Sequence, residues 1–188
     1  MHRAVFLPEG VQEGGEGLMK NNIVLIGFMG SGKTSVGGKL SRALHYNFLD
    51  TDQLLEEEFG CTIGEFFEKE GETEFRRRET MLLNDLLEKL TRTVLATGGG
   101  MPLIPKNAEL LREIGTVIYL KASEEETVKR LSGDMTRPLL AGENLKERVH
   151  CLLEERTPLY RAAAHYMLET DGKSFYEIIR EIEQAALI

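Results

Sequence analysis

The sequence predicts an α/β protein in which a parallel sheet is covered by helices on both faces. Short apolar runs alternate along the chain with longer segments of helical periodicity, and no segment repeats. Uninterrupted apolar runs are typical of strands that are buried on both faces of a parallel sheet. The length of 188 residues, of which 41% are hydrophobic, suits one such domain.

We expect this domain to span residues 22–188 and residues 1–21 to form a disordered tail. Glycines and glutamates are mixed in the tail, a composition too polar to pack against a core. Met19 closely precedes the first convincing strand, so it competes with Met1 as the start of translation.

The first half of the domain contains two predicted strands. Residues 23–26 are an apolar, partly β-branched run that ends in glycine, which indicates a buried strand. Val36, Leu40 and Leu44 then recur at helical spacing, and residues 46–49 form a short second strand that leads into an acidic segment. Helical periodicity returns in three segments, at 54–59, 63–69 and 72–90.

The second half of the domain contains three more predicted strands. Residues 93–97 form a buried strand that ends in three glycines. Further helices and strands follow at 106–113, 116–120, 124–131, 145–156, 166–169 and 175–186. The glycine-rich and charged motifs lie at the carboxyl ends of the strands, where ligands bind in parallel sheets.

The composition excludes several classes of protein. Lys and Arg number 23 against 31 Asp and Glu, and the net charge of −8 argues against a nucleic-acid partner. No apolar run approaches the roughly 20 residues that cross a bilayer. The isolated Cys61 and Cys151 suit a reducing compartment. We therefore expect a cytoplasmic protein with no membrane partner, and a monomer because no coiled-coil pattern is present.

Gly27-x-x-x-x-Gly32-Lys33-Thr34 is a complete phosphate-binding P-loop pattern, and it lies between a predicted strand and helix as this motif requires. Gly30 and Gly32 let the backbone approach the phosphates, and successive N–H groups form an anion cradle with the start of the helix. Lys33 is suited to bridge the β- and γ-phosphates, and the Thr34 hydroxyl is suited to bind Mg²⁺. The sequence contains no Asn-Lys-x-Asp motif for guanine recognition, which argues against a GTPase.

Asp50-x-Asp52 follows the second strand and is a candidate acid–base pair. One carboxylate would organise metal-bound water, and the other would accept a proton from an incoming hydroxyl. The alternative is that Asp52 only caps the helix that begins there.

Arg76, Arg77 and Arg78 lie in the long predicted helix, where consecutive side chains point in different directions. At most one or two of them can face a pocket. Arg76 would suit a carboxylate on the substrate, because the guanidinium fork matches a carboxylate bidentately. A surface ion pair with Glu72 and Glu79 is the alternative.

Two flexible segments complete the set of motifs. Gly98-Gly99-Gly100 carries no side chains, so a substrate could approach its backbone closely, although a mobile turn would have the same composition. Residues 132–143 interrupt the helical periodicity, contain Arg137 and have the composition of a lid. A lid arginine that closes onto the γ-phosphate would neutralise charge and exclude water.

The order of these motifs resembles the shikimate kinase family from about residue 23 to the end of the chain. The matching segments are Gly27-Phe-Met-Gly-Ser-Gly-Lys-Thr34, Phe48-Leu-Asp-Thr-Asp52, Gly71-Glu-x-x-Phe-Arg76, Thr97-Gly-Gly-Gly100, Arg137-Pro-Leu-Leu140 and Glu155-Arg156-x-Pro-Leu-Tyr160. The resemblance implies a five-stranded, nucleoside-monophosphate-kinase-like P-loop fold, with a substrate-binding region near 51–80 and a lid near 132–143. It also implies transfer of the γ-phosphoryl of ATP to the 3-hydroxyl of shikimate, on the route to chorismate and the aromatic amino acids.

The resemblance further implies how shikimate is bound. Arg76 and Arg156 would grip its carboxylate, and Asp52 would hold ring hydroxyls and assist deprotonation of the one that attacks. Gly98 and Gly99 would contact the substrate. Phe67 and Phe75 match apolar walls of the same pocket.

On the nucleotide side, the resemblance implies that Lys33 and Arg137 stabilise the transferring phosphoryl, that Thr34 binds Mg²⁺ and that Asp50 reaches the metal through water. Arg130 matches a position that stacks on adenine. The nucleotide contacts expected in full are Gly30, Ser31, Gly32, Lys33, Thr34, Ser35, Arg130 and Arg137.

Two other functions compete with shikimate phosphorylation. Gluconate kinases are also small P-loop kinases whose substrate bears hydroxyls and a carboxylate. A non-catalytic ATP-binding regulatory module would bind ATP without transferring phosphate. Lys33, Asp52, Arg137 and Arg156 are all present, which favours a catalyst.

Overall fold

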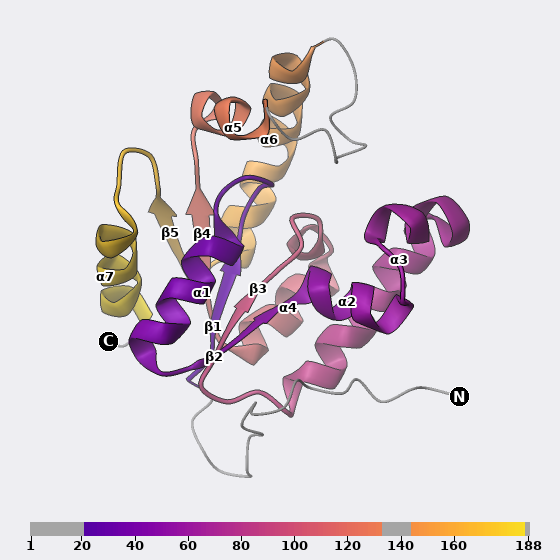
Figure 1. Ribbon diagram of the computed structural model, residues 1–188, viewed down its shortest axis with the longest axis horizontal. Coiled ribbons are helices and arrows are strands. Elements are labelled where there is room, and N and C mark those ends of the chain that lie inside the picture. Colours follow the sequence, from indigo (N-terminus) through magenta and orange to yellow (C-terminus); the bar gives the residue numbers. More distant parts are fainter. Residues whose placement is uncertain (1–20, 133–143, 187–188) are drawn as a thin grey trace.

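The structure is a computed structural model that describes residues 21–132 and 144–186. Its centre is a five-stranded sheet in which every pairing is parallel (Figure 1). The strands are β1 (Ile23–Ile26), β2 (Asn47–Asp50), β3 (Thr93–Ala96), β4 (Thr116–Lys121) and β5 (Tyr166–Glu169), in the spatial order β2-β3-β1-β4-β5. Strand β1, which leads into the P-loop, is thus central, and the acidic pair lies at the end of the edge strand β2.

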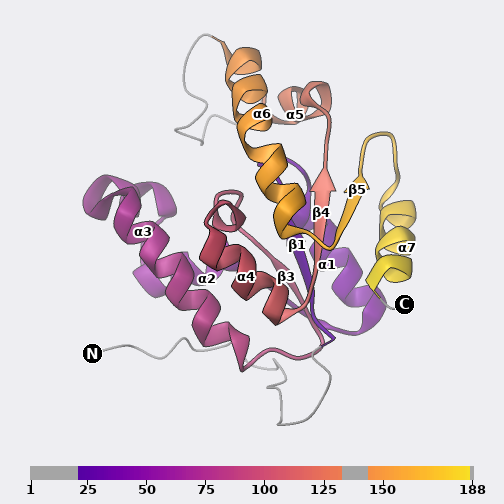
Figure 2. The same ribbon diagram turned by 180° about the vertical axis from the view of Figure 1, so that it is seen from behind.

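Helices cover both faces of this sheet. They are α1 (Lys33–Leu44), α2 (Thr51–Phe59), α3 (Ile63–Leu87), α4 (Pro105–Ile114), α5 (Glu124–Leu131), α6 (Leu145–Ala163) and α7 (Phe175–Ala186), with a short 3-10 helix η1 at Met101–Leu103. Helices α1 and α7 lie in front of the sheet in Figure 1, and α3, α4 and α6 lie over the opposite face in Figure 2. The fold class predicted from the sequence is confirmed.

The two faces of the sheet bury different side chains of the same strand. In β1, Val24 and Ile26 pack toward α2, α3, α4 and α6, whereas Ile23 and Leu25 pack toward α1 and α7. All four side chains are at most 2% exposed. Because successive strand residues point to opposite faces, both faces can be buried only if every position is apolar. This explains why β1 appears in the sequence as a continuous apolar run.

Helix α3 is interrupted at Gly71, whose φ of 82° and ψ of 168° are not helical. A residue with a side chain is strained at such a positive φ, so glycine is the residue that permits this break. The two separate helical segments predicted at 63–69 and 72–90 are therefore confirmed, although the second one ends earlier, at Leu87.

Helix α6 is longer than predicted. The expected end at Arg156 is wrong, because the helix continues through Pro158 to Ala163. Proline has no N–H to donate and normally disfavours a helix interior. Burial of Tyr160 and Ala163 against the core offsets this cost.

Some predictions lie outside the described residues. These are the tail up to residue 20, Arg137 and all but the first residue of the segment expected to form the lid. Within the described ranges, no helix is both long and apolar enough to cross a membrane.

Candidate active site

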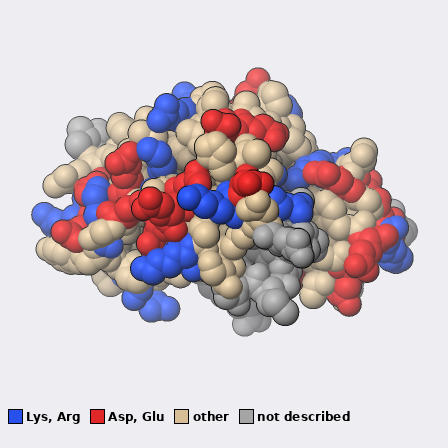
Figure 3. Space-filling model, turned by 90° about the horizontal axis from the view of Figure 1, so that it is seen from above, with Lys and Arg blue, Asp and Glu red and all other residues tan. Residues whose placement is uncertain are grey.

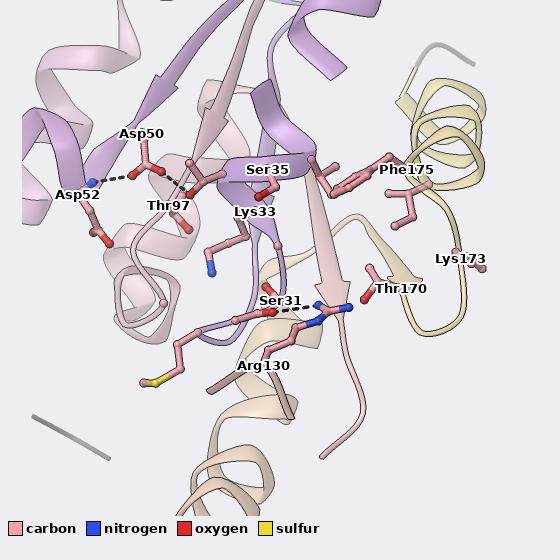
Figure 4. A pocket seen from close by; sticks show the side chains of 17 residues that line it. Ser31, Lys33, Ser35, Asp50, Asp52, Thr97, Arg130, Thr170, Lys173 and Phe175 are labelled. Carbon is pink, nitrogen blue, oxygen red and sulfur yellow. Dashed lines mark hydrogen bonds between the residues drawn. The ribbon is translucent and has the colours of Figure 1, made fainter. Parts of the chain in front are cut away.

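A pocket of about 510 Å³ lies at the carboxyl ends of the strands, between the P-loop and the segment that joins β5 to α7 (Figure 4). It is lined by Met29, Gly30, Ser31, Gly32, Lys33, Thr34, Ser35, Val36, Asp50, Asp52, Thr97, Gly99, Arg130, Thr170, Lys173, Phe175 and Ile178. Figure 3 shows this end of the molecule, where basic and acidic side chains are interspersed. An anionic ligand would therefore depend on the local cations of the pocket.

The P-loop has the backbone that an anion cradle needs. Gly32 precedes α1 in a left-handed conformation, with φ of 90°, and no side chain caps the helix. The first N–H groups of a helix have no partner within it, so they can bind an anion together with the positive end of the helix dipole. The Lys33 ammonium group lies over the loop and donates to the carbonyl oxygens of Gly27 and Phe28, each at 3.0 Å.

Asp50 joins the P-loop to the acidic segment. Its Oδ2 accepts from the Thr34 hydroxyl at 2.8 Å, and its Oδ1 accepts from the backbone N–H of Asp52 at 3.0 Å. Asp50 is therefore the N-cap of α2, and the alternative that Asp52 caps this helix is wrong. Because Asp50 supplies the cap, the Asp52 side chain lies in the first turn of α2 and lines the pocket.

The triple-glycine turn after β3 is tightly packed. The N–H of Gly98 donates to the Thr51 hydroxyl at 2.9 Å, and a Cβ added at residue 98 would overlap the Asp52 carboxylate. A Cβ added at Gly100 would lie 2.5 Å from Nη1 of Arg76. The absence of side chains thus allows two candidate substrate-binding groups, Asp52 and Arg76, to lie directly against the turn.

Arg76 is held by two carboxylates of its own helix. Its Nη1 donates to Glu79 at 2.7 Å, and its Nη2 and Nε donate to Glu72 at 3.0 and 3.2 Å. The ion pairs considered from the sequence therefore exist, and the same guanidinium also abuts Gly100.

The neighbouring arginines are engaged elsewhere. Arg77 pairs with Glu74, and Arg78 pairs with Glu58 and Glu74. One arginine of the three thus reaches the glycine turn, which agrees with the limit set by helix geometry.

Glu79 is a buried carboxyl group whose side chain is 1% exposed. Burial raises the pKa of Glu79 from its ordinary value of 4.5 to about 7, with a smaller contribution from the charge of Asp52, while Arg76 acts in the opposite direction. The sequence indicates only that Glu79 can reach Arg76. Its burial depends on how α3 packs, which no local pattern reveals.

We expect Glu79 to make the protein less stable as the pH rises from about 4.5 to 7. The folded protein keeps the Glu79 proton up to a higher pH than the unfolded chain, whose pKa is near 4.5, so the unfolded state binds fewer protons in this range. Glu79→Gln removes this titration, and its stability relative to wild type should improve as the pH rises. Urea unfolding between pH 4.5 and 7.5 measures the difference, and equal slopes for the two proteins would contradict this expectation.

Arg156 extends from α6 to Phe28 in the P-loop segment. Its guanidinium lies over the Phe28 ring, with 5.7 Å between the Cζ and the ring centroid, and its Nε is buried without a hydrogen-bond partner among the described residues.

Phe75 is buried, and its ring centroid lies 4.6 Å from that of Phe67. These two aromatic residues form an apolar layer next to Arg76, whose Cζ is 5.5 Å from the Phe75 ring.

The nucleotide-site residues expected from the sequence lie around one pocket wherever the structure describes them. Arg130 on α5 donates to the carbonyl oxygen of Gly30 at 3.0 Å and to Glu126 at 2.9 Å. Gly98, Arg76 and Arg156 do not line this pocket. Gly98 belongs to the glycine turn that adjoins the pocket through Gly99, Arg76 abuts Gly100 of that turn, and Arg156 lies over Phe28.

Sequence reasoning missed the wall formed by the β5–α7 segment. This wall consists of Thr170, Lys173, Phe175 and Ile178. Figure 4 shows Thr170, Lys173 and Phe175 on the other side of the P-loop from Asp50 and Asp52. The position of the segment was the one signal in the sequence that could have indicated this wall, because the segment follows the carboxyl end of a parallel strand, where ligands bind. It contains no motif that would mark these residues individually.

Comparison with known proteins gives consistent matches. The family model described as shikimate kinase matches residues 29–186. Shikimate kinases from Caldanaerobacter subterraneus subsp. tengcongensis and Methylococcus capsulatus are 44% and 46% identical to this chain, covering 87% and 88% of it and 95% and 92% of those proteins. A solved structure of shikimate kinase from Acinetobacter baumannii in complex with shikimate has a TM-score of 0.83 and 41% identity, covering 95% of this chain and 94% of that one.

Proposed function

The chain belongs to the shikimate kinase family, and from this premise we propose how its residues divide the work of the reaction. The enzyme transfers the γ-phosphoryl of ATP to the 3-hydroxyl of shikimate, giving shikimate 3-phosphate and ADP, in the biosynthesis of chorismate and the aromatic amino acids. One observation carries the division of roles. A P-loop pocket adjoins, through Asp52 and Gly99, a side-chain-free turn against which Arg76 lies.

ATP occupies the 510 Å³ pocket in this proposal. Residues 30–35 bind the phosphates through backbone N–H groups and hydroxyls, and Lys33 moves from its loop carbonyls to the β- and γ-phosphates. Arg130 and the β5–α7 wall flank the end of the pocket that lies away from Asp50 and Asp52, and the adenine lies between them.

The residues present fit a bound Mg²⁺. The Thr34 hydroxyl and the Asp50 carboxylate lie 2.8 Å apart beside the phosphate cradle, and hard oxygen donors of this kind suit this cation. Thr34 would hold the metal directly, and Asp50 would hold it through water. The metal, when bound, supplies positive charge to the phosphate oxygens.

Shikimate lies against the glycine turn in this proposal. Arg76 and Arg156 bind its carboxylate, and Gly98 and Gly99 leave room for the ring. Asp52 accepts the proton of the 3-hydroxyl as that oxygen bonds to the γ-phosphorus. The bond from the γ-phosphorus to the bridging oxygen breaks, and ADP leaves with the electron pair. Lys33 and Arg137, the latter outside the described residues, neutralise the developing charge.

We also propose that residues 22–188 form one catalytic domain that acts as a cytoplasmic monomer, without nucleic-acid or membrane partners. The described residues to which we assign roles lie around one pocket, at the glycine turn that adjoins it and beside Phe28, within one copy of the chain. Light scattering of the purified enzyme with both substrates tests the oligomeric state.

ADP production from ATP tests the assignment of substrate and metal. We expect shikimate to stimulate it strongly, gluconate to have no effect, and a chelator of divalent cations to abolish it. Stimulation by gluconate alone would favour a gluconate kinase. ATP binding without stimulation by either acid would favour a regulatory module.

A further inference from the structure

Tyr160 lies behind the glycine turn and joins it to α6. Its side chain is 0% exposed, and its hydroxyl donates to the carbonyl oxygen of Gly99 at 2.7 Å. Arg156 is one helical turn earlier on α6, so the two side chains share a face of the helix. A single buried hydroxyl therefore connects the helix that carries Arg156 with the turn that adjoins the pocket.

The same hydroxyl also interacts with Arg156. Burial raises the pKa of Tyr160, whereas the nearby charge of Arg156 acts in the opposite direction. A phenol that keeps its proton can donate one hydrogen bond and accept others. While Tyr160 donates to Gly99, its oxygen thus keeps a lone pair that it can offer to the nearby Arg156 guanidinium.

We propose that Tyr160 is a positioning residue for shikimate, which orients Arg156 relative to the Gly99 backbone without touching the substrate. This inference rests on the proposed function, which places Arg156 and Gly99 against shikimate. Arginine has a long side chain with many rotamers, and fixing it before the substrate arrives lowers the entropy lost on binding. The Phe28 ring supports one face of the guanidinium but cannot fix its rotation, whereas a hydrogen bond at its edge can.

Tyr119 offers a matched control next to Tyr160. It is 1% exposed, its ring centroid lies 5.1 Å from that of Tyr160, and its hydroxyl lies near Thr157 on α6. Both tyrosines are thus buried residues of one aromatic pair, and each carries one hydroxyl. Tyr119 makes no hydrogen bond to the glycine turn among those of the described residues.

The test compares Tyr160→Phe with Tyr119→Phe, since each change removes one buried hydroxyl and keeps the ring. We expect Tyr160→Phe to raise the KM for shikimate about tenfold, because a hydrogen bond to a charged group is lost. The KM for ATP should stay within about twofold. Tyr119→Phe should leave both KM values within about twofold. Thermal unfolding of both variants shows whether their stabilities differ.

The outcomes separate this inference from the function on which it rests, with Arg156→Lys measured alongside. If Arg156→Lys raises the KM for shikimate and Tyr160→Phe does not, the positioning role is wrong while the proposed site stands. An Arg156→Lys variant with unchanged KM for shikimate would remove Arg156 from the site and the inference with it. If Tyr160→Phe raises both KM values equally and lowers the unfolding temperature, its hydroxyl is merely structural and the inference is also overturned.

Discussion

Asp52→Asn should lower kcat by about 10²- to 10⁴-fold, the usual contribution of a general base. The amide has the size of the carboxylate and still accepts a hydrogen bond, but it does not take a proton at neutral pH. The Asp52 side chain lines the pocket beside Gly98, where a substrate hydroxyl can approach it. The loss should therefore appear in the chemical step, with the KM values for both substrates changing little.

The structure also indicates why this variant should fold. The hydrogen bond that starts α2 uses the backbone N–H of residue 52 and the side chain of Asp50, so the substitution leaves the cap in place. Asp85→Asn, at an exposed position of α3, is the matched control and should retain wild-type kcat. Steady-state kinetics at saturating ATP and shikimate measure the effect. A kcat for Asp52→Asn within a few-fold of wild type would remove Asp52 from the role of base.

Arg76→Ala is expected to weaken shikimate binding by about 100-fold, because a charge-assisted hydrogen bond contributes up to roughly 3 kcal/mol. ATP binding should be unaffected, since Arg76 does not line the nucleotide pocket. The variant also leaves Glu79 buried without the cation that neutralises it. Because Glu79 can take up a proton instead, we expect a stability loss of only about 1–3 kcal/mol.

The double variant Arg76→Ala with Glu79→Gln separates these two effects. It removes the buried carboxylate together with its counter-ion, so it should recover stability and still bind shikimate weakly. Arg77→Ala, which breaks a more exposed pair with Glu74, is the control for loss of one arginine from α3. Urea unfolding and calorimetric titration with shikimate measure the two quantities. If the double variant also regains shikimate affinity, Arg76 does not bind the substrate.

Much of the fold could be predicted because the signals are local. Burial on both faces requires continuous apolar runs, so β1 and β3 were located to within a residue. The limits of the prediction appear where packing overrides local preference. Helix α6 passes through Pro158 because Tyr160 beyond it is buried, and the sequence around the proline does not show that burial.

In the candidate site, too, some features follow from local motifs and others depend on packing. The P-loop and Asp50-x-Asp52 are compact motifs whose chemistry follows from their spacing, and the structure brings them into hydrogen-bond contact. The link between Tyr160 and Gly99 joins residues 61 positions apart, and the β5–α7 wall meets the P-loop only in three dimensions. Contacts of this kind depend on the sheet order, which places β5 two strands from β1.

Arg76 has a consequence for specificity, because its guanidinium is already occupied by Glu79 and Glu72. A carboxylate that arrives at Arg76 therefore has to displace one of these glutamates or share the arginine with them. Such an exchange creates less new charge attraction than pairing with an unoccupied arginine, so a negative charge alone does not select the ligand. The shape of the ligand then decides whether it binds. If the proposed site is correct, it favours acids whose hydroxyls reach Asp52 while the carboxylate meets Arg76, and it disfavours simpler anions that carry no such hydroxyls.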